Sequence, residues 1–118
     1  MHELSVTEAL LNTACEYAHK QKAKNVTVLN IKIGRLSGIV DDSVQFYWDI
    51  VAKETICEGS ELRFNFIPAK FECQQCKFQY EIEDELIPCP RCKSMDLVTI
   101  QGDEFLLESI EIEKERYE

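Results

Sequence analysis

The chain has 118 residues, of which 22 are acidic and 13 are Lys or Arg, so its net charge is −9. Such an acidic surface repels phosphate backbones and disfavours a nucleic-acid partner. Hydrophobic residues make up 45% of the chain, which is typical of a globular protein. No apolar run approaches the ~18 residues that span a bilayer, and the N-terminal segment lacks the basic and apolar regions of a secretory signal. We therefore expect a globular cytoplasmic protein that does not bind a membrane.

The first third of the chain predicts a helix followed by a strand. Residues 5–8 fit a capping box, in which Ser5 is the N-cap and Glu8 reaches back to its amide. Residues 26–33 are rich in β-branched side chains and predict a strand. Between them, apolar residues recur at helical spacing to about Lys22, and these are Val6, Leu10, Ala14, Tyr17 and Ala18.

A second helix and a second strand follow a loop that contains two glycines, at residues 34–38. A helix is expected over residues 41–53, with Asp41 or Asp42 as its cap. Alternating apolar side chains over residues 62–66 predict a strand with one buried side, which the next proline ends. The helix would have a broad apolar face made of Val44, Phe46, Tyr47, Trp48, Ile50 and Val51.

The character of the sequence changes over residues 69–102, which hold four cysteines, two prolines and only short apolar runs. Residues 104–115 are again rich in apolar side chains and predict a strand that returns to the first sheet. This order predicts an α+β fold. Residues 1–68, completed by a strand within 103–118, would form a small mixed sheet with two helices. Residues 69–102 would be an inserted, zinc-ribbon-like four-cysteine module.

Two CxxC pairs separated by twelve residues lie within this segment, and they consist of Cys73, Cys76, Cys89 and Cys92. Each pair can place two thiolates at the tip of a tight turn, and two facing turns complete a tetrahedral site of four sulfurs. The spacing also allows a short hairpin, to which residues 77–84 supply one strand. The array favours structural Zn²⁺, because four protein ligands leave no open position for catalysis.

Two other interpretations of the cysteines remain open. Iron also takes four thiolates, and a CxxC pair is also found in redox-active dithiols, although these need no second pair. Cys15 and Cys57 lie outside the array and are expected to be structural, Cys15 in the helix core or at its edge and Cys57 in a loop.

The chain begins with Met1-His2-Glu3. A free amine at Met1, the amide nitrogen of His2 and its Nδ1 can chelate one metal, and such nitrogen donors favour square-planar Ni²⁺ or Cu²⁺. The Glu3 amide or carboxylate could supply a fourth ligand. Taken alone, His2 is weak evidence for a metal site and is more simply a polar residue at a loose chain end. The other histidine, His19, is expected to be a plain helix-surface residue.

Five segments together closely resemble the HypA/HybF family of nickel metallochaperones for hydrogenase maturation: MHELSV, IGRLSGI, CQQCKFQY, CPRC and GDEFLLESIEI. The resemblance covers essentially the whole chain in order. It implies that nickel binds to Met1 (amine), His2 and Glu3. It also implies that zinc binds to Cys73, Cys76, Cys89 and Cys92. Some members carry a histidine in or beside the zinc module that joins the nickel site, and this sequence has none there.

The resemblance further implies a non-enzymatic carrier that delivers nickel to the hydrogenase large-subunit precursor. Its partners would be the maturation GTPase HypB and, in some organisms, urease accessory proteins. The sequence supports the absence of catalysis, since it shows no nucleophile, histidine and carboxylate set and no phosphate-binding glycine loop. The alternative is a zinc-ribbon protein–protein adaptor without a nickel function.

Overall fold

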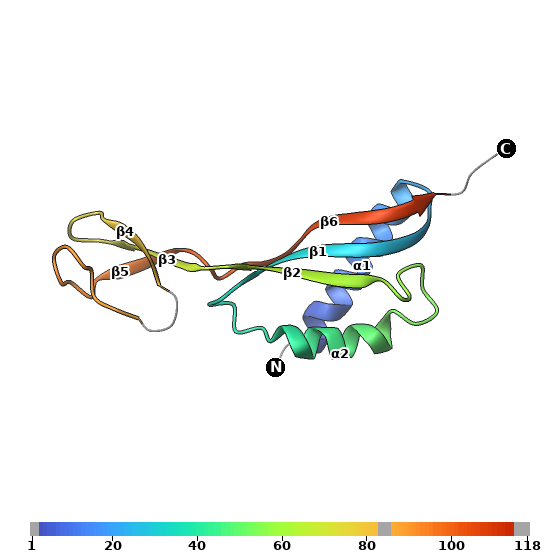
Figure 1. Cartoon of the computed structure of the whole chain (residues 1–118), viewed down its shortest axis with the longest axis horizontal. Coiled ribbons are helices and arrows are strands. Elements are labelled where there is room, and N and C mark those ends of the chain that lie inside the picture. Colours follow the sequence, from blue (N-terminus) through green and yellow to red (C-terminus); the bar gives the residue numbers. More distant parts are fainter. Residues whose placement is uncertain (1–2, 83–85, 115–118) are drawn as a thin grey trace. The chain divides into compact units, whose positions relative to one another are not determined.

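The structure is a computed structural model, and it describes residues 3–82 and 86–114. Its elements form two three-stranded sheets, in the orders β2-β1-β6 and β4-β3-β5 (Figure 1). The elements are α1 (Glu3–Lys20), β1 (Ala23–Gly34), α2 (Asp41–Val51), β2 (Glu61–Ile67), β3 (Ala69–Cys73), β4 (Gln79–Ile82), β5 (Leu97–Gln101) and β6 (Phe105–Lys114). The predicted α+β class is therefore confirmed. Neither of these helices is long and apolar enough to cross a membrane.

The chain divides into two compact units. The first unit takes the described residues of Met1–Lys32, Ile39–Asn65 and Leu106–Glu118, and the second takes Ile33–Gly38 and Phe66–Phe105. The second unit thus holds both CxxC pairs together with the loop that follows β1.

The sheet of the first unit is mixed. Figure 1 shows β1 and β2 running in the same direction and β6 running in the opposite direction. Two side-chain hydrogen bonds support this arrangement: Thr27 Oγ1 donates to the Glu111 carbonyl at 3.2 Å, and Asn30 Nδ2 donates to Ser109 Oγ at 3.0 Å. Residue numbers rise along β1 as they fall along β6, so these two strands are antiparallel. The predicted return of the last strand to the first sheet is confirmed.

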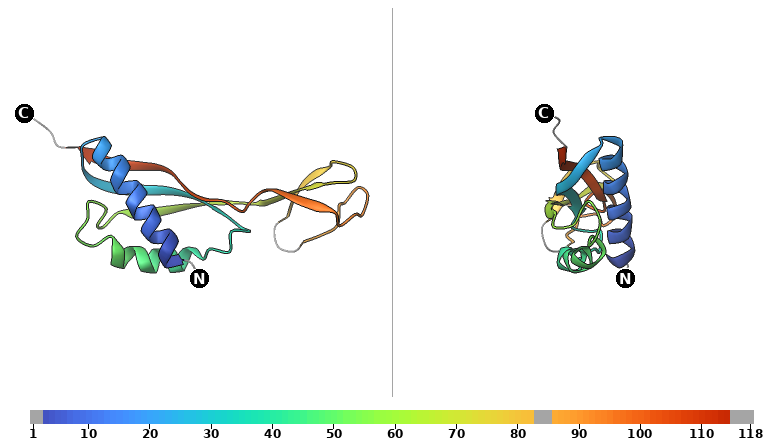
Figure 2. Two further views of the ribbon diagram at one scale, coloured as in Figure 1. Left: turned by 180° about the vertical axis from the view of Figure 1, so that it is seen from behind. Right: turned by 90° about the vertical axis from the view of Figure 1, so that its right-hand side faces the viewer.

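Helix α1 lies across one face of this sheet (Figure 2) and packs against α2. Its buried side chains are Thr7, Leu10, Ala14 and Ala18, which recur at helical spacing. The helix begins at Glu3, so the predicted N-cap at Ser5 is wrong. Thr7 is buried although it is polar. Burial is possible because its hydroxyl donates a hydrogen bond to the Glu3 carbonyl one turn earlier. Tyr17, expected in the core, is 53% exposed.

Helix α2 buries a narrower face than its sequence suggests. Val44 and Trp48 are buried, and the Trp48 indole N–H donates to Ser60 Oγ at 3.1 Å. Phe46 and Ile50, on the predicted apolar face, are exposed. The predicted aspartate cap is wrong, because Val40 is the N-cap residue and makes no side-chain cap. The Glu3 carboxylate instead accepts a hydrogen bond from the Val40 N–H at 3.3 Å, a favourable place for an anion at the start of a helix.

The sheet of the second unit is antiparallel and small. Phe71 of β3 lies opposite Tyr80 of β4 on one side and Thr99 of β5 on the other. A register shift between Lys70 and Phe71 interrupts the pairing with β5. The predicted strand within residues 77–84 is confirmed as β4, and the end of that segment lies outside the described residues.

Two glycines allow strands of the second unit to approach closely. The Gly34 N–H donates to the Glu104 carbonyl at 2.7 Å, and the Leu36 N–H donates to the Gly102 carbonyl at 2.6 Å. A Cβ at Gly34 would lie 2.0 Å from the Gly102 carbonyl oxygen, and a Cβ at Gly102 would lie 2.7 Å from Ala69 Cα. Gly102 also has a φ of 109°, in the region that favours glycine. Any side chain here must displace backbone.

Gly34→Ala is therefore expected to destabilise the protein by about 2–3 kcal/mol or more, since the clash is with backbone that cannot rotate away. Denaturant unfolding of the metal-loaded protein measures this loss. Gly59→Ala is the matched control: no atom lies within 4 Å of its added Cβ, and only its φ of 78° is strained, at a cost of about 1 kcal/mol. Equal unfolding midpoints for the two variants would contradict the close approach at Gly34.

Candidate metal centre

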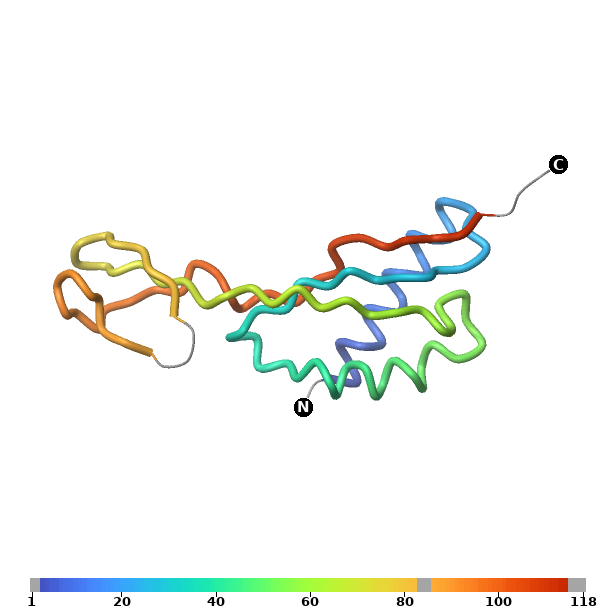
Figure 3. Tube along the Cα trace, in the orientation of Figure 1, coloured from blue at the N-terminus to red at the C-terminus, as the bar shows by residue number. Residues whose placement is uncertain are grey.

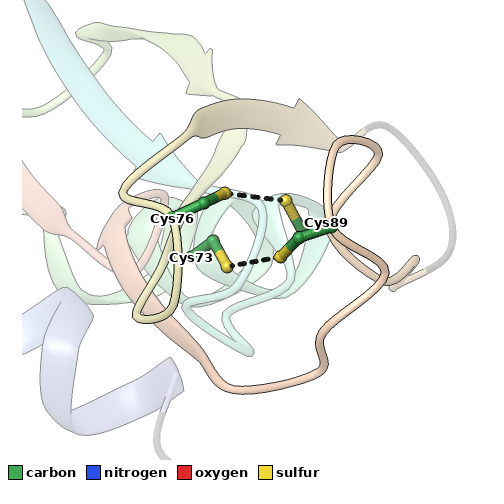
Figure 4. Close-up of side chains that lie close together, drawn as sticks. Cys73, Cys76 and Cys89 are labelled. Atoms are coloured by element: carbon green, nitrogen blue, oxygen red, sulfur yellow. Dashed lines mark hydrogen bonds between the residues drawn. The ribbon is translucent and has the colours of Figure 1, made fainter.

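The structure brings the four predicted cysteines together. One ligand atom from each of Cys73, Cys76, Cys89 and Cys92 lies within 4.8 Å of all the others, and this is the one such cluster in the described part of the chain. Sγ of Cys73 is 3.4 Å from that of Cys92, and Sγ of Cys76 is 3.6 Å from that of Cys89 (Figure 4). The contacts join the two CxxC pairs, so both are required to build the site.

The two CxxC pairs form two separate backbone turns of the same type. The N–H of Lys77 donates to the Cys73 carbonyl at 2.9 Å, and the N–H of Lys93 donates to the Cys89 carbonyl at 2.8 Å. Both lysines have positive φ, 66° and 67°. The two turns lie next to each other at the end of the second sheet, in yellow and orange in Figure 3. This lysine pair was not predicted from the sequence, although the repeated CxxCK pattern is a visible signal of it.

The cluster rests on a small group of apolar and aromatic side chains. Cys73 and Cys89 are fully buried, and Cys76 and Cys92 are exposed. The rings of Phe78 and Tyr80 stack with centroids 6.1 Å apart. Buried residues of this core number only four, Cys73, Tyr80, Ile82 and Cys89, among the described residues. Such a core depends on whatever holds the cysteines together.

Further polar contacts secure the segment between the cysteine pairs. The Tyr80 hydroxyl donates to the Ile87 carbonyl at 2.8 Å, which ties β4 to the approach to Cys89. The guanidinium of Arg91 lies over the Phe78 ring, 5.3 Å from its centroid. Arg91 is one of the two residues inside the second CxxC pair, so this contact links the two turns. Neither contact was foreseen from the sequence.

Three of the four thiols have shifted pKa values. The backbone N–H of Cys76 lowers the pKa of the Cys73 thiol. Burial raises the pKa of the Cys89 thiol, but the backbone N–H groups of Cys92 and Arg91 outweigh it, and this pKa falls from 9.0 to about 6. A backbone N–H of Ser94 lowers the pKa of Cys92, yet the neighbouring thiols prevail and raise it to about 12.

These shifts show what the cluster needs in order to ionise fully. Backbone N–H groups favour the thiolate at Cys73 and Cys89, whereas hydrogen bonds with the neighbouring thiols and burial raise the pKa of Cys92 and hold its proton. A divalent cation held by the four sulfurs would stabilise their thiolate forms and displace that proton. The donor set is four sulfurs, which fits a tetrahedral metal of the zinc or iron type.

The predicted nickel ligands are only partly described. Met1 and His2 lie outside the described residues, so the structure leaves that prediction untested. Glu3 is the first residue of α1, and its carboxylate accepts from the Val40 N–H. His19 is exposed on α1, in agreement with the surface role predicted for it.

Cys15 and Cys57 lie outside the four-sulfur cluster. As predicted, Cys15 is half-buried at the helix edge and Cys57 lies in the loop after α2. Their sulfurs are nevertheless 3.9 Å apart. This pairing was not predicted from the sequence, because nothing local to either residue signals a partner 42 positions away.

Known proteins resemble this chain along nearly its full length. A hydrogenase maturation factor HypA from Dehalococcoides mccartyi strain CBDB1 is 43% identical over 115 residues, covering 98% of this chain and 97% of the relative. One from Caldanaerobacter subterraneus subsp. tengcongensis is 44% identical over 114 residues, covering 96% and 100%. The solution structure of the nickel metallochaperone HypA from Helicobacter pylori superposes with a TM-score of 0.71 at 25% identity, covering 98% and 100%.

A second solution structure, of a HypA protein, has a TM-score of 0.75 at 25% identity and covers 98% of each chain. The family described as hydrogenase/urease nickel incorporation, metallochaperone, hypA matches residues 1–112. A metallochaperone carries a metal and is not an enzyme, which agrees with the prediction from the sequence. By its sequence, its fold and its four-cysteine cluster, the chain belongs to the HypA family of nickel-incorporation metallochaperones.

Proposed function

We propose that this protein binds Ni²⁺ through Met1, His2 and Glu3 and delivers it to the hydrogenase large-subunit precursor. The nickel-binding domain would be residues 1–68, completed by the strand within 103–118. Membership of a nickel-incorporation family carries the proposal. The proposed ligands are the Met1 amine, the amide nitrogen and Nδ1 of His2, and an atom of Glu3, a set that suits square-planar Ni²⁺.

The start of α1 supports such a site. The helix begins at Glu3, and the first N–H groups of a helix have no carbonyl partner within it. An amide nitrogen at or before Glu3 can therefore lose its proton to nickel without breaking a helical hydrogen bond. The Glu3 carbonyl and carboxylate already accept hydrogen bonds from Thr7 and Val40. Its amide is thus a better fourth ligand than its carboxylate, which would have to leave Val40.

Zinc at Cys73, Cys76, Cys89 and Cys92 would complete the protein. We assign it a structural role within a module at residues 69–102, because four thiolates close the coordination shell. The short distances between the two CxxC pairs support this assignment, as does the small number of other core residues in the segments that the structure describes. Apparent binding energies of ~10–16 kcal/mol in comparable zinc modules would hold so small a core together.

The proposed setting is the cytoplasm, with the GTPase HypB and, where urease is present, urease accessory proteins as further partners. A net charge of −9 favours partners with basic surfaces and speeds their encounter. The competing function is a zinc-ribbon adaptor that binds proteins and has no use for nickel. The two functions differ in a single requirement, which is an intact and unblocked Met1-His2-Glu3 segment.

Two changes at this segment are expected to abolish one nickel site. His2→Ala removes the imidazole, and one extra residue before Met1 moves the amine out of the chelate, so calorimetric titration of the tag-free, zinc-loaded protein with Ni²⁺ should lose that site in both. His19→Ala, which changes the exposed histidine of α1, is the matched control and should bind nickel normally.

Nickel binding that persists unchanged in both terminal variants would favour the adaptor.

Glu3→Gln distinguishes the Glu3 amide from the Glu3 carboxylate as the fourth nickel ligand, because a glutamine oxygen can still accept from the Val40 N–H. Nickel affinity within about threefold of the parent would support the amide as ligand. A loss of tenfold or more, about 1.4 kcal/mol, would support the carboxylate.

Cys89→Ser is expected to lower the zinc content from about one ion per chain to almost none, because three thiolates bind zinc far less tightly than four. Metal analysis gives the stoichiometry and separates zinc from iron. Hydrogen exchange should show lost protection in β3, β4 and β5, which form one sheet, while α1 stays protected. Cys15→Ser is the control and should keep its zinc. Protection of the second sheet that survives zinc loss would contradict the structural role.

A further inference from the structure

The first unit contains two thiols that the metal centre does not use. Cys15 lies on α1, Cys57 lies in the loop after α2, and their Sγ atoms are 3.9 Å apart. Both are free thiols. We propose that Cys15 and Cys57 form a redox site, which a peroxide converts reversibly to an intramolecular disulfide.

The loop that carries Cys57 is firmly anchored on both sides of the thiol. The Ile56 carbonyl accepts from the Val26 N–H of β1 at 2.8 Å. The Cys57 carbonyl accepts from the Ser60 hydroxyl at 2.6 Å, and Ser60 in turn accepts from the Trp48 indole at 3.1 Å. The sulfur of Cys57 is therefore presented by fixed backbone and not by a mobile loop.

Cys15 is held equally well by the helix around it. Ala14 and Ala18 are fully buried on α1, and such small side chains let a helix approach its neighbours closely. The two sulfurs thus meet through rigid elements. Little conformational freedom is lost when a bond joins groups that are already ordered, so closing this pair is entropically inexpensive.

The two thiols differ in their accessibility to solvent, and therefore in the step that each can perform. Cys57 is fully buried, and Cys15 is partly accessible. Burial first, and the neighbouring Cys15 second, raise the pKa of the Cys57 thiol to about 12, so it stays protonated and does not attack an oxidant by itself. Cys15 is therefore the thiol that meets the peroxide, and Cys57 is the thiol that resolves the product.

The chemistry balances with one peroxide molecule as oxidant. The Cys15 thiolate attacks one peroxide oxygen, the O–O bond breaks, and the sulfur becomes a sulfenic acid as hydroxide leaves and takes up a proton to form water. The Cys57 sulfur then attacks the Cys15 sulfur, its proton leaves with the hydroxyl group as a second water, and the S–S bond forms. Two thiols are oxidised and one peroxide is reduced to two waters.

Closure has a structural consequence for the first unit. The sulfurs must approach from 3.9 Å to the ~2.05 Å of a disulfide, which requires small rotations of both side chains. The bond would then link α1 to the segment between α2 and β2 across a long stretch of chain. Cross-links of this kind restrict the unfolded state and stabilise the folded one. Oxidation would thereby stiffen the unit to which α1 belongs.

The test treats the full-length, zinc-loaded protein with an equimolar amount of hydrogen peroxide. We expect the intact mass to fall by two hydrogen atoms and peptide mapping to find Cys15 linked to Cys57. Zinc, followed with a chromogenic chelator, should stay bound on the same time scale. The midpoint of thermal unfolding of the first unit should rise by on the order of 10 °C, and dithiothreitol should reverse all of these changes.

Two variants assign the steps. In Cys57→Ala the Cys15 sulfenic acid cannot be resolved and should accumulate as a dimedone adduct. In Cys15→Ser, a near-isosteric change at a partly exposed position, Cys57 should remain reduced. A disulfide between chains, oxidation of the four zinc-site cysteines before Cys15, or equal oxidation of Cys57 in Cys15→Ser would each overturn the proposal.

Discussion

The second unit depends on four sulfur atoms that lie close together and do not all ionise in the absence of a cation. Cys73, Cys76, Cys89 and Cys92 lie within 4.8 Å of one another, and backbone N–H groups already favour the thiolate at Cys73 and Cys89. The same proximity keeps Cys92 protonated, with a pKa of about 12. A divalent cation would allow all four sulfurs to ionise. The two CxxCK turns, the stacked Phe78 and Tyr80 and the short strands β3 to β5 are arranged around these sulfurs. Without the cation, a core with only four buried residues in the described part of this unit has little to hold it together.

The first unit is stabilised in a more ordinary way, through packing of α1 on a mixed sheet and on α2. Its unusual feature is Glu3, which begins α1 and whose carboxylate accepts from Val40 ahead of α2. One residue at the end of the chain therefore helps to define the start of both helices. A metal ligand placed here is adjacent to a rigid frame, yet the amide nitrogens before the helix are not committed to its hydrogen bonds. This is the combination that a terminal chelate needs.

The two helices, the strands β1, β2, β4 and β6 and the four-cysteine cluster were predictable because each depends on a local or periodic signal, whereas β3 and β5 were not predicted. The spacing of the CxxC pairs predicted the four-cysteine cluster, and the apolar composition of residues 104–115 predicted β6. The failures were tertiary in origin. Ser5 fits the pattern of an N-cap, but α1 begins two residues earlier, at Glu3, whose carbonyl accepts a hydrogen bond from the Thr7 hydroxyl. The close approach at Gly34 and the meeting of Cys15 with Cys57 join residues far apart in sequence, and no periodicity encodes them.

The two metal sites proposed for this chain differ in the property that a carrier most requires. Four thiolates enclose a cation completely, so it leaves only if the module opens, which suits a permanent structural ion. Amine, amide and imidazole nitrogens at a chain end are exposed to exchange, and a recipient can replace them one at a time. Protons compete for the same nitrogens, which makes the affinity adjustable. A closed site of four sulfurs and an open site of nitrogens, both as proposed, would therefore allow one small protein to keep one metal while it gives up another.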